Sequence, residues 1–282
     1  MRAAAARCSG RCGLWLPCSY WHCSSEAKRT EILHMNMYRY CAGWARSNAS
    51  PGAKVLDYGC GAGTIVQMMI EKGVEAYGCD VFYDGGDYSR RVPPVLLENG
   101  TIRRMEGDRI PFEDESFDLI VNNQVLEHVP DLDLVLQEMA RVLKPGGRVL
   151  SLFPDRSVWR ERHCGIPFLH WFPKLSRSRV YYAYALRSLG LGHHKKNKPK
   201  WQWSEDFCTW LDNWTYYRPR KIIHDNFRQR IGTIRNLEVQ CLTEWLGSRA
   251  WLVRLMPAFV SEQIVHKMAC LVFETTKPGR AG

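Results

Sequence analysis

A glycine-rich turn at residues 57–64 has the residue types and the spacing to hold a nucleotide-like ligand. It reads Asp57-Tyr58-Gly59-Cys60-Gly61-Ala62-Gly63-Thr64. Glycine lets the backbone approach a ligand closely, and the first N–H groups of a following helix have no partner within that helix. A dinucleotide-binding G-x-G-x-x-G turn would need glycine at position 64, where the chain has threonine. The pattern therefore favours another ligand, and Asp57 can bind an ammonium group or fix the loop.

Three histidines are candidates for a general base, because the ordinary pKa of histidine lies close to neutral pH. His163 follows the expected fifth strand by about ten residues, and His170 lies seven residues further on. His128 stands next to Glu127 at the expected start of a helix. For each histidine, a structural role with a hydrogen bond to a backbone carbonyl is the alternative. Glu127 and His128 are expected to point to different sides of the helix, and the sequence predicts no metal site.

The elements that must position these residues alternate between strands and helices. Helices are expected over residues 30–46, 65–72 and 131–143, with Asp131 as the cap of the third. Strands are expected over residues 55–56, 75–80, 101–107, 117–122 and 148–153, and again over 238–242 and 269–274. This alternation predicts a parallel sheet that is covered by helices on both faces.

Four stretches, in this order and spacing, resemble class I S-adenosylmethionine-dependent methyltransferases of the ubiquinone-biosynthesis and type 11 kind. They are the glycine turn with its strand (residues 55–64), Asp80 at the end of the second strand, the run Gly107-Asp108-Arg109-Ile110-Pro111-Phe112, and residues 117–129 followed by 141–147. The resemblance covers about residues 50–155. It implies an α/β fold with a Rossmann-like class I methyltransferase sheet, mostly parallel with the last strand antiparallel, with helices on both faces and a helical insertion.

The same resemblance implies S-adenosylmethionine as the cofactor and gives roles to the residues around it. Asp57 would meet the ammonium group of the cofactor, Asp80 both ribose hydroxyls, and Asp108 the adenine amine. Phe82 would lie against the adenine, although a place in the core is the alternative, and an aspartate at a strand end is often only a helix cap. The implied cofactor-binding residues are Asp57, Gly59, Cys60, Gly61, Gly63, Asp80, Phe82, Asp108, Arg109 and Asn123.

The net charge of +10 is distributed unevenly along the chain. Residues 51–155 carry a net charge of −8, whereas residues 156–230 carry +11 and six of the eleven tryptophans. We therefore expect a leader over residues 1–29, a cofactor-binding Rossmann-like core over 30–155, a basic aromatic insertion over 156–225, and a C-terminal helix and strands over 226–282 that complete the sheet. The insertion would form a lid over the acceptor, and its excess positive charge favours an anionic acceptor or contact with an anionic membrane surface.

We expect an S-adenosylmethionine-dependent methyltransferase that modifies an oxygen or nitrogen atom of a small molecule, such as a saccharide or another anionic metabolite. A hydroxyl acceptor would need a general base, whereas a thiolate or carboxylate would not. One alternative is methylation of RNA or another nucleic acid, against which residues 122–125 read Asn-Asn-Gln-Val rather than Asn-Pro-Pro-Tyr. The other alternative is a non-catalytic partner protein that binds the cofactor, against which the intact glycine loop and Asp80 argue.

The first 25 residues contain no acid and are rich in Ala, Arg, Cys and Ser. This composition fits a transit-like leader or an extension of the reading frame upstream of a start near Met35 or Met37. The four cysteines of this segment lack the usual paired zinc spacing. Other cysteines lie in apolar stretches, as buried thiols do, which favours a reducing compartment. We expect a cytoplasmic protein without a membrane-spanning helix, or an imported protein if the leader is a targeting segment.

Overall fold

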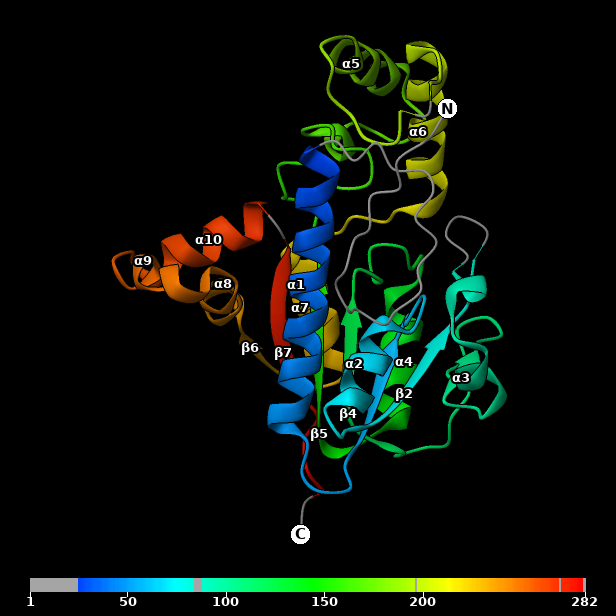
Figure 1. The fold of residues 1–282 in the computed structure, drawn as a ribbon, viewed down its shortest axis with the longest axis vertical. Helices are drawn as coiled ribbons and strands as arrows, with labels where there is room; N and C mark the ends of the chain where they lie inside the picture. Colours follow the sequence, from blue (N-terminus) through cyan, green and yellow to red (C-terminus); the bar gives the residue numbers. More distant parts are fainter. Residues whose placement is uncertain (1–24, 84–87, 196, 269, 281–282) are drawn as a thin grey trace, which may run out of the picture.

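A seven-stranded sheet with the order β3-β2-β1-β4-β5-β7-β6 forms the centre of the protein (Figure 1). The computed structural model describes residues 25–83, 88–195, 197–268 and 270–280. The strands are β1 (Lys54–Tyr58), β2 (Glu75–Asp80), β3 (Ile102–Arg104), β4 (Phe117–Asn123), β5 (Leu143–Phe153), β6 (Thr233–Asn236) and β7 (Leu271–Thr276).

The pairing of the strands confirms the predicted fold class. Strands β1 to β5 pair in parallel, and β7 runs antiparallel to both of its neighbours, β5 and β6. The strand order reverses between β1 and β4, because β2 and β3 lie on one side of β1 while β4 and β5 lie on the other. In open α/β sheets, ligands bind at the carboxyl ends of the strands at such a reversal. The glycine turn begins at this point, directly after β1.

Helices cover both faces of the sheet. They are α1 (Ser25–Asn48), α2 (Thr64–Glu71), α3 (Pro94–Glu98), α4 (Leu132–Val142), α5 (Arg177–Ser188), α6 (Lys200–Trp214), α7 (Arg220–Arg230), α8 (Glu238–Leu246), α9 (Trp251–Arg254) and α10 (Ala258–Met268). One face packs against α1, α2, α8 and α10 in a single buried hydrophobic cluster. The other face packs against α4 and α7 in a second cluster. The sheet is thus buried on both sides, which explains its nearly continuous apolar strands.

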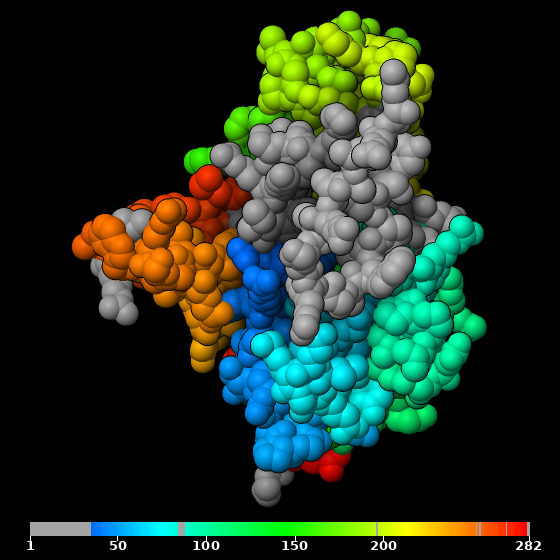
Figure 2. All heavy atoms as spheres, in the orientation of Figure 1, coloured from blue at the N-terminus to red at the C-terminus, as the bar shows by residue number. Residues whose placement is uncertain are grey.

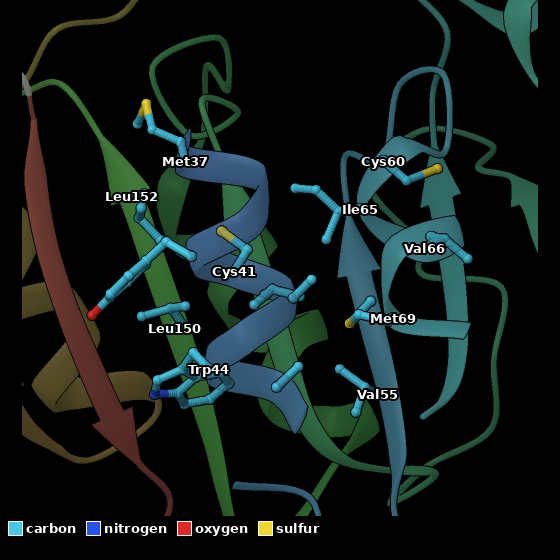
Figure 3. Close-up of a cluster of buried hydrophobic side chains, with 14 of the residues drawn as sticks. Met37, Cys41, Trp44, Val55, Cys60, Ile65, Val66, Met69, Leu150 and Leu152 are labelled. Carbon is cyan, nitrogen blue, oxygen red and sulfur yellow. The ribbon is translucent and has the colours of Figure 1, made fainter. Parts of the chain in front are cut away.

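The first cluster fixes α1 and α2 beside each other over the sheet (Figure 3). Met37, Cys41 and Trp44 of α1 point toward the strand β5, and all three are buried. Val66 and Met69 of α2 occupy the neighbouring part of the same layer. Burial of a side chain of this size contributes roughly 1.5–3 kcal/mol relative to leaving it exposed. The packing of α2 therefore holds the turn that precedes it in a fixed position.

The helix predicted over residues 131–143 is present as α4, and its predicted cap is confirmed. Asp131 Oδ1 accepts hydrogen bonds from the N–H groups of Asp133 and Leu134, at 3.0 and 3.2 Å. The apolar side chains of α4 are buried against the sheet, including those of Leu136 and Met139. The expected helices over 30–46 and 65–72 correspond to α1 and α2.

The strand predicted over residues 238–242 is wrong, because this segment belongs to helix α8. Leu237 and Cys241 are buried and Trp245 is partly buried in the α1–α2 layer, and this i, i+4 spacing suits a helix that lies on the sheet. The strand in this part of the chain is β6, which comes just before it and pairs with β7 at the edge of the sheet. The other strand predicted there, over residues 269–274, corresponds to β7.

Helices α5 and α6 lie apart from the sheet and pack on each other around a small core of their own. Trp203 and Leu211 of α6 are buried in this core together with Ala183 of α5. Figures 1 and 2 show the pair at one end of the molecule, while α8, α9 and α10 project from its side. These two helices fall within the segment predicted as the basic insertion, residues 156–225.

Most of the predicted leader lies outside the described residues, together with its four cysteines. Its last residues, 25–29, belong to the first turns of α1, which begins earlier than the helix predicted from residue 30. Within the described part of the chain, no helix is long and apolar enough to span a membrane.

Candidate functional site

The turn between β1 and α2 forms the floor of the candidate site, and its shape requires glycine. Gly59 and Gly63 have φ angles of +73° and +76°, a region that other residues rarely adopt. A Cβ atom at Gly59 would overlap the methyl groups of Val125, and one at Gly63 would overlap Ile102. The first turn of α2 has no side-chain cap, so its N–H groups remain available to a ligand. The predicted glycine loop is therefore a rigid cradle with open backbone donors.

Asp80 joins the end of β2 to this cradle. Its Oδ2 atom accepts a hydrogen bond from the N–H of Gly61 at 2.8 Å, and its Oδ1 atom accepts one from the N–H of Phe82 at 2.6 Å. A carboxylate oxygen can accept more than one hydrogen bond, so Asp80 retains the capacity to bind hydroxyl groups. The predicted position of Asp80 at the strand end, beside the glycine turn, is confirmed.

Asp57 is buried beneath the same turn without a partner for one of its oxygens. The side chain is 1% exposed, and among the described residues its Oδ2 atom has no hydrogen-bond donor. Burial, and then the charge of Asp80, raise the pKa of Asp57 well above its usual range. A buried carboxylate without a counterion is costly, and a cation next to it would restore its charged form. Asp57 thus fits the ammonium partner that we predicted.

The other predicted cofactor-binding residues differ in how deeply they are buried around Asp57 and Asp80. Cys60 and Phe82 are buried in the α1–α2 layer, and Arg104 lies over the Phe82 ring at 5.1 Å, so the core position considered for Phe82 is observed. Asp108 and Arg109 are exposed in the loop after β3. The pKa of Tyr58, at the end of β1, is raised by burial and then by neighbours that include Asp108.

Asn123 ends β4 next to the glycine turn, because β4 pairs directly with β1. It is 9% exposed, and its Oδ1 atom has no donor among the described residues. The following residue, Gln124, adopts a φ of +58°, and its N–H donates to the carbonyl of Leu152 at 2.7 Å. A buried amide without its full set of partners at this strand end fits a ligand-binding position.

His163 is held by a buried glutamate that the sequence analysis did not single out. Its Nδ1 atom lies 2.6 Å from Oε1 of Glu161, and the hydroxyl of Tyr217 donates to the same oxygen at 2.8 Å. Burial would raise the pKa of Glu161, but the charge of His163 and the hydrogen bonds outweigh it and hold the pKa below its usual range. Burial would lower the pKa of His163, and Glu161 outweighs this effect and raises it.

His128 faces His163, with 5.0 Å between the ring centres. Its Nδ1 atom lies 2.6 Å from the carbonyl oxygen of Trp214, so this nitrogen carries the proton. Burial, followed by the nearby His163, lowers the pKa of His128 to about 4. His128 therefore enters the cluster as a neutral imidazole whose Nε2 atom can accept a proton or a metal.

The expectation that Glu127 and His128 point to different sides of a helix is wrong. They lie in a turn that ends before α4 begins at Leu132, in which the N–H of His128 donates to the carbonyl of Val125. One ligand atom from each of Glu127, His128 and His163 lies within 4.8 Å of the others. A carboxylate with two imidazoles is a donor set that can hold a divalent cation.

Glu127 is the second buried acid of the candidate site to which the sequence assigned no role. It is 1% exposed, and neither of its carboxylate oxygens has a hydrogen-bond donor among the described residues. Burial raises its pKa to about 7, although His163 opposes this effect. Its place beside His128 in the sequence was the available signal. Tyr217, which lies 54 residues from His163, gave no such signal.

His170 lies next to this cluster rather than in it. It is 5% exposed, and its ring packs against that of Tyr217 at 4.6 Å. Burial is the main cause that lowers its pKa. The structure therefore brings together two of the three predicted histidines, His128 and His163, and links the third to them through Tyr217.

Comparisons with known proteins find sequence matches over the central part of the chain. Residues 56–151 match the sequence model of the family described as "Methyltransferase domain". The ubiquinone biosynthesis O-methyltransferase of Chelativorans sp. (strain BNC1) is 34% identical over 110 residues, which are 38% of this chain and 42% of that protein. The methyltransferase GfsG of Streptomyces halstedii is 38% identical over 109 residues, which are 38% of this chain and 39% of that protein.

The chain thus spans less than half the length of these two relatives. Among solved structures, an S-adenosylmethionine-dependent methyltransferase from Mesorhizobium loti aligns over 84% of this chain and 98% of its own, with 14% identity and a TM-score of 0.49. The matched segment begins in β1 and ends in β5, so it contains the glycine turn, Asp80 and Asn123.

Proposed function

We propose that this chain transfers the methyl group of S-adenosylmethionine to a small molecule, because residues 56–151 match the family described as "Methyltransferase domain". The acceptor atom is an oxygen or nitrogen of an anionic metabolite or a saccharide. The observation that carries the proposal is the pair Asp57 and Asp80 beneath a glycine cradle at the reversal point of the sheet.

The residues around the cradle fit the chemical groups of this cofactor. Asp57 would hold its ammonium group, Asp80 its ribose hydroxyls, and Asp108, with the backbone of Arg109, its adenine amine. Gly59, Gly61 and Gly63 leave room for the ligand, Cys60 and Phe82 supply apolar surface, and Asn123 would lie near the sulfonium. When bound, the cofactor supplies an electrophilic methyl group, and the protein has to align an acceptor with it.

The histidine cluster favours a hydroxyl as the acceptor, because a hydroxyl must lose a proton during transfer. Glu161 holds Nδ1 of His163 and leaves Nε2 as the nitrogen that can take this proton. In this proposal, His163 is the base, Glu161 orients it, and His128 and Glu127 shape the wall beside it. His170 supports the cluster through the ring of Tyr217.

Residues 156–225 would serve as the lid of the acceptor site. Their position after β5 supports this role, because His163 and Tyr217 both come from this segment. The net charge of +11 over residues 156–230 supports an anionic acceptor. Residues 30–155 would form the cofactor-binding core, which residues 226–282 complete with β6 and β7.

We also propose a cytoplasmic location for this activity. The seven cysteines that the structure describes as free are all buried: Cys41, Cys60, Cys79, Cys164, Cys208, Cys241 and Cys270. Buried thiols of this kind are typical of proteins from a reducing compartment.

The test is transfer of a labelled methyl group from S-adenosylmethionine into a small-molecule extract and, in parallel, into total RNA. We expect label in one or a few small molecules, which mass spectrometry then identifies. Label found only in RNA would move the function to nucleic-acid methylation. The absence of label from both fractions, with intact cofactor binding, would support a partner protein instead.

A further inference from the structure

At the carboxyl end of β5 lies a cleft whose lining residues have no role in the proposed transfer step. It has a volume of about 420 Å³ and is bounded by residues 155–157, the start of α7 and the last turn of α10. Its polar side chains include those of Arg156, Ser157, Arg220, Gln263, His266 and Lys267. We call it the basic cleft.

Permanent positive charges dominate this cleft. Arg156 and Lys267 have no ion-pair partner among the described residues, and Arg220 makes a single contact with Glu238, at 3.3 Å. The guanidinium and ammonium groups of these side chains are the usual partners of phosphate and carboxylate groups. An anion in the cleft would therefore meet three cations from three different elements.

The carboxylate that lines the cleft, that of Asp155, is held by contacts with Ser157 and His266. Asp155 is 1% exposed, and its Oδ1 atom accepts hydrogen bonds from the N–H and the hydroxyl of Ser157, at 2.9 and 2.8 Å. Its Oδ2 atom lies 2.9 Å from Nε2 of His266. His266 is itself 5% exposed and leaves Nδ1 without a hydrogen bond among the described residues. In the wall of the cleft, the Asp155 carboxylate is therefore already in contact with its neighbours, while Nδ1 of the buried His266 imidazole still lacks a hydrogen bond among the described residues.

The start of α7 adds backbone donors to the same cleft. Pro219 and Arg220 line it, no side chain caps the first N–H groups of this helix, and its first turn contains no acid. The start of a helix attracts anions through these N–H groups and the helix dipole. The end of α10 opposes this effect only weakly, because the carbonyls of Val265 and Lys267 accept hydrogen bonds from Cys270 and Trp159.

We propose that the basic cleft binds a phosphate monoester or inorganic phosphate as a dianion. The dianion would meet Arg156, Arg220 and Lys267 together with the first N–H groups of α7. The cleft and the histidine cluster share two segments of chain, which are joined by the hydrogen bond from the N–H of Arg156 to the carbonyl of Arg218. This chemistry fits two sources, a phosphate ester on the methyl acceptor and a separate phosphate ligand.

Calorimetric titration of the full chain with inorganic phosphate tests the site itself. We expect saturable binding that weakens about tenfold in Arg156→Gln and about tenfold in Lys267→Gln, because each loses a charged contact. Arg228→Gln is the matched control, since Arg228 is exposed further along α7 and pairs with Asp225 outside the cleft. Binding that does not saturate, or that is equally strong in all three variants, would overturn the proposal.

A second experiment, which rests on the proposed function, tells whether the phosphate belongs to the methyl acceptor or to a separate ligand. Phosphatase treatment of the extract before the labelled methyl assay should abolish transfer if the acceptor carries the phosphate, and should leave transfer intact if the phosphate is a separate ligand. The phosphate titration uses neither cofactor nor acceptor. Its result can therefore be interpreted even if the methyl-transfer proposal fails.

Discussion

The pKa values of the buried carboxylates Asp57, Glu127 and Glu161 differ because the neighbours of these groups differ. Glu161 accepts hydrogen bonds from the hydroxyl of Tyr217 and the N–H of Cys164 and lies against His163, which keeps its pKa low. Among the described residues, Oδ2 of Asp57 and both carboxylate oxygens of Glu127 have no hydrogen-bond donor, so burial dominates and raises the pKa of each. Groups whose pKa values are pushed apart at one end of a sheet are typical of functional sites. We therefore expect ligands to bind next to Asp57 and Glu127, whose carboxylate oxygens have unused hydrogen-bonding capacity.

At this scale, the account predicts that His163→Ala lowers the turnover number of labelled methyl transfer by about 10² to 10⁴, because the hydroxyl loses its general base. Cofactor affinity should stay within about twofold, since His163 does not contact the glycine cradle. Comparison of turnover and cofactor titration for the wild-type protein and the variant gives the result. His194→Ala is the control, because His194 is exposed in another loop.

Full turnover in the His163 variant would remove this residue as the base. Transfer that stops after chelation and returns with a divalent cation would instead assign Glu127, His128 and His163 to a metal site, since their ligand atoms lie within 4.8 Å of one another.

At the scale of the elements, the glycine turn depends on the close approach of the loop after β4. The backbone at Gly59 has a φ of +73°, and Val125 fills the space where a Cβ atom would lie. Thus Gly59→Ala should combine backbone strain with a steric overlap. Each of these effects costs roughly 1–3 kcal/mol.

We therefore expect Gly59→Ala to weaken binding of S-adenosylhomocysteine by at least about tenfold in a calorimetric titration. The double variant Gly59→Ala with Val125→Ala should recover part of the affinity, because the second substitution removes the overlap but leaves the φ strain. A single variant that binds as tightly as the wild-type protein would show that this turn does not shape the cofactor site.

The elements of the core could be predicted from the sequence because their signals are local. A strand, a glycine turn and a helix follow one another at residues 54–71, and Asp131 caps α4 as expected. The segment 238–242 could not be assigned in this way, since a short apolar run fits a strand or a helix equally well. Contacts of Cys241 with a distant layer decide its state. The same holds for Tyr217, which reaches Glu161 only through the tertiary fold.

At the scale of the whole molecule, one buried histidine links stability to pH. His224 of α7 is 7% exposed, packs against Phe273 of β7, and has an Nε2 atom without a partner among the described residues. Burial is the main cause that lowers its pKa to about 4, whereas the pKa in the unfolded chain is about 6.5. Between these values the unfolded chain binds more protons, so the free energy of unfolding falls as the pH falls.

We expect His224 to account for about 1–2 kcal/mol of the stability that is lost between pH 7 and pH 5. Urea unfolding at the two pH values measures this loss. In His224→Leu, the difference between the two pH values should shrink by that amount, because the leucine cannot be protonated. An unchanged difference would show that protonation of this residue is not linked to unfolding.

The positive and negative charges of the chain lie on different parts of the fold. The acidic segment, residues 51–155, supplies strands β1 to β5, whereas the basic segment, residues 156–230, supplies α5, α6 and α7. The positive excess behind the net charge of +10 is therefore concentrated in residues 156–230, most of which belong to the segment that we propose as the acceptor lid.

The most direct test of the central claim is calorimetric titration of the wild-type protein and Asp80→Ala with S-adenosylmethionine. We expect saturable binding by the wild-type protein and a loss of at least about tenfold in affinity for the variant, because this substitution removes the carboxylate that holds Gly61 and that we propose binds the ribose of the cofactor. Circular dichroism at the same temperature checks that the variant is folded. Equal affinity of a folded Asp80→Ala variant, or no binding by the wild-type protein, would contradict the assignment of the cofactor site.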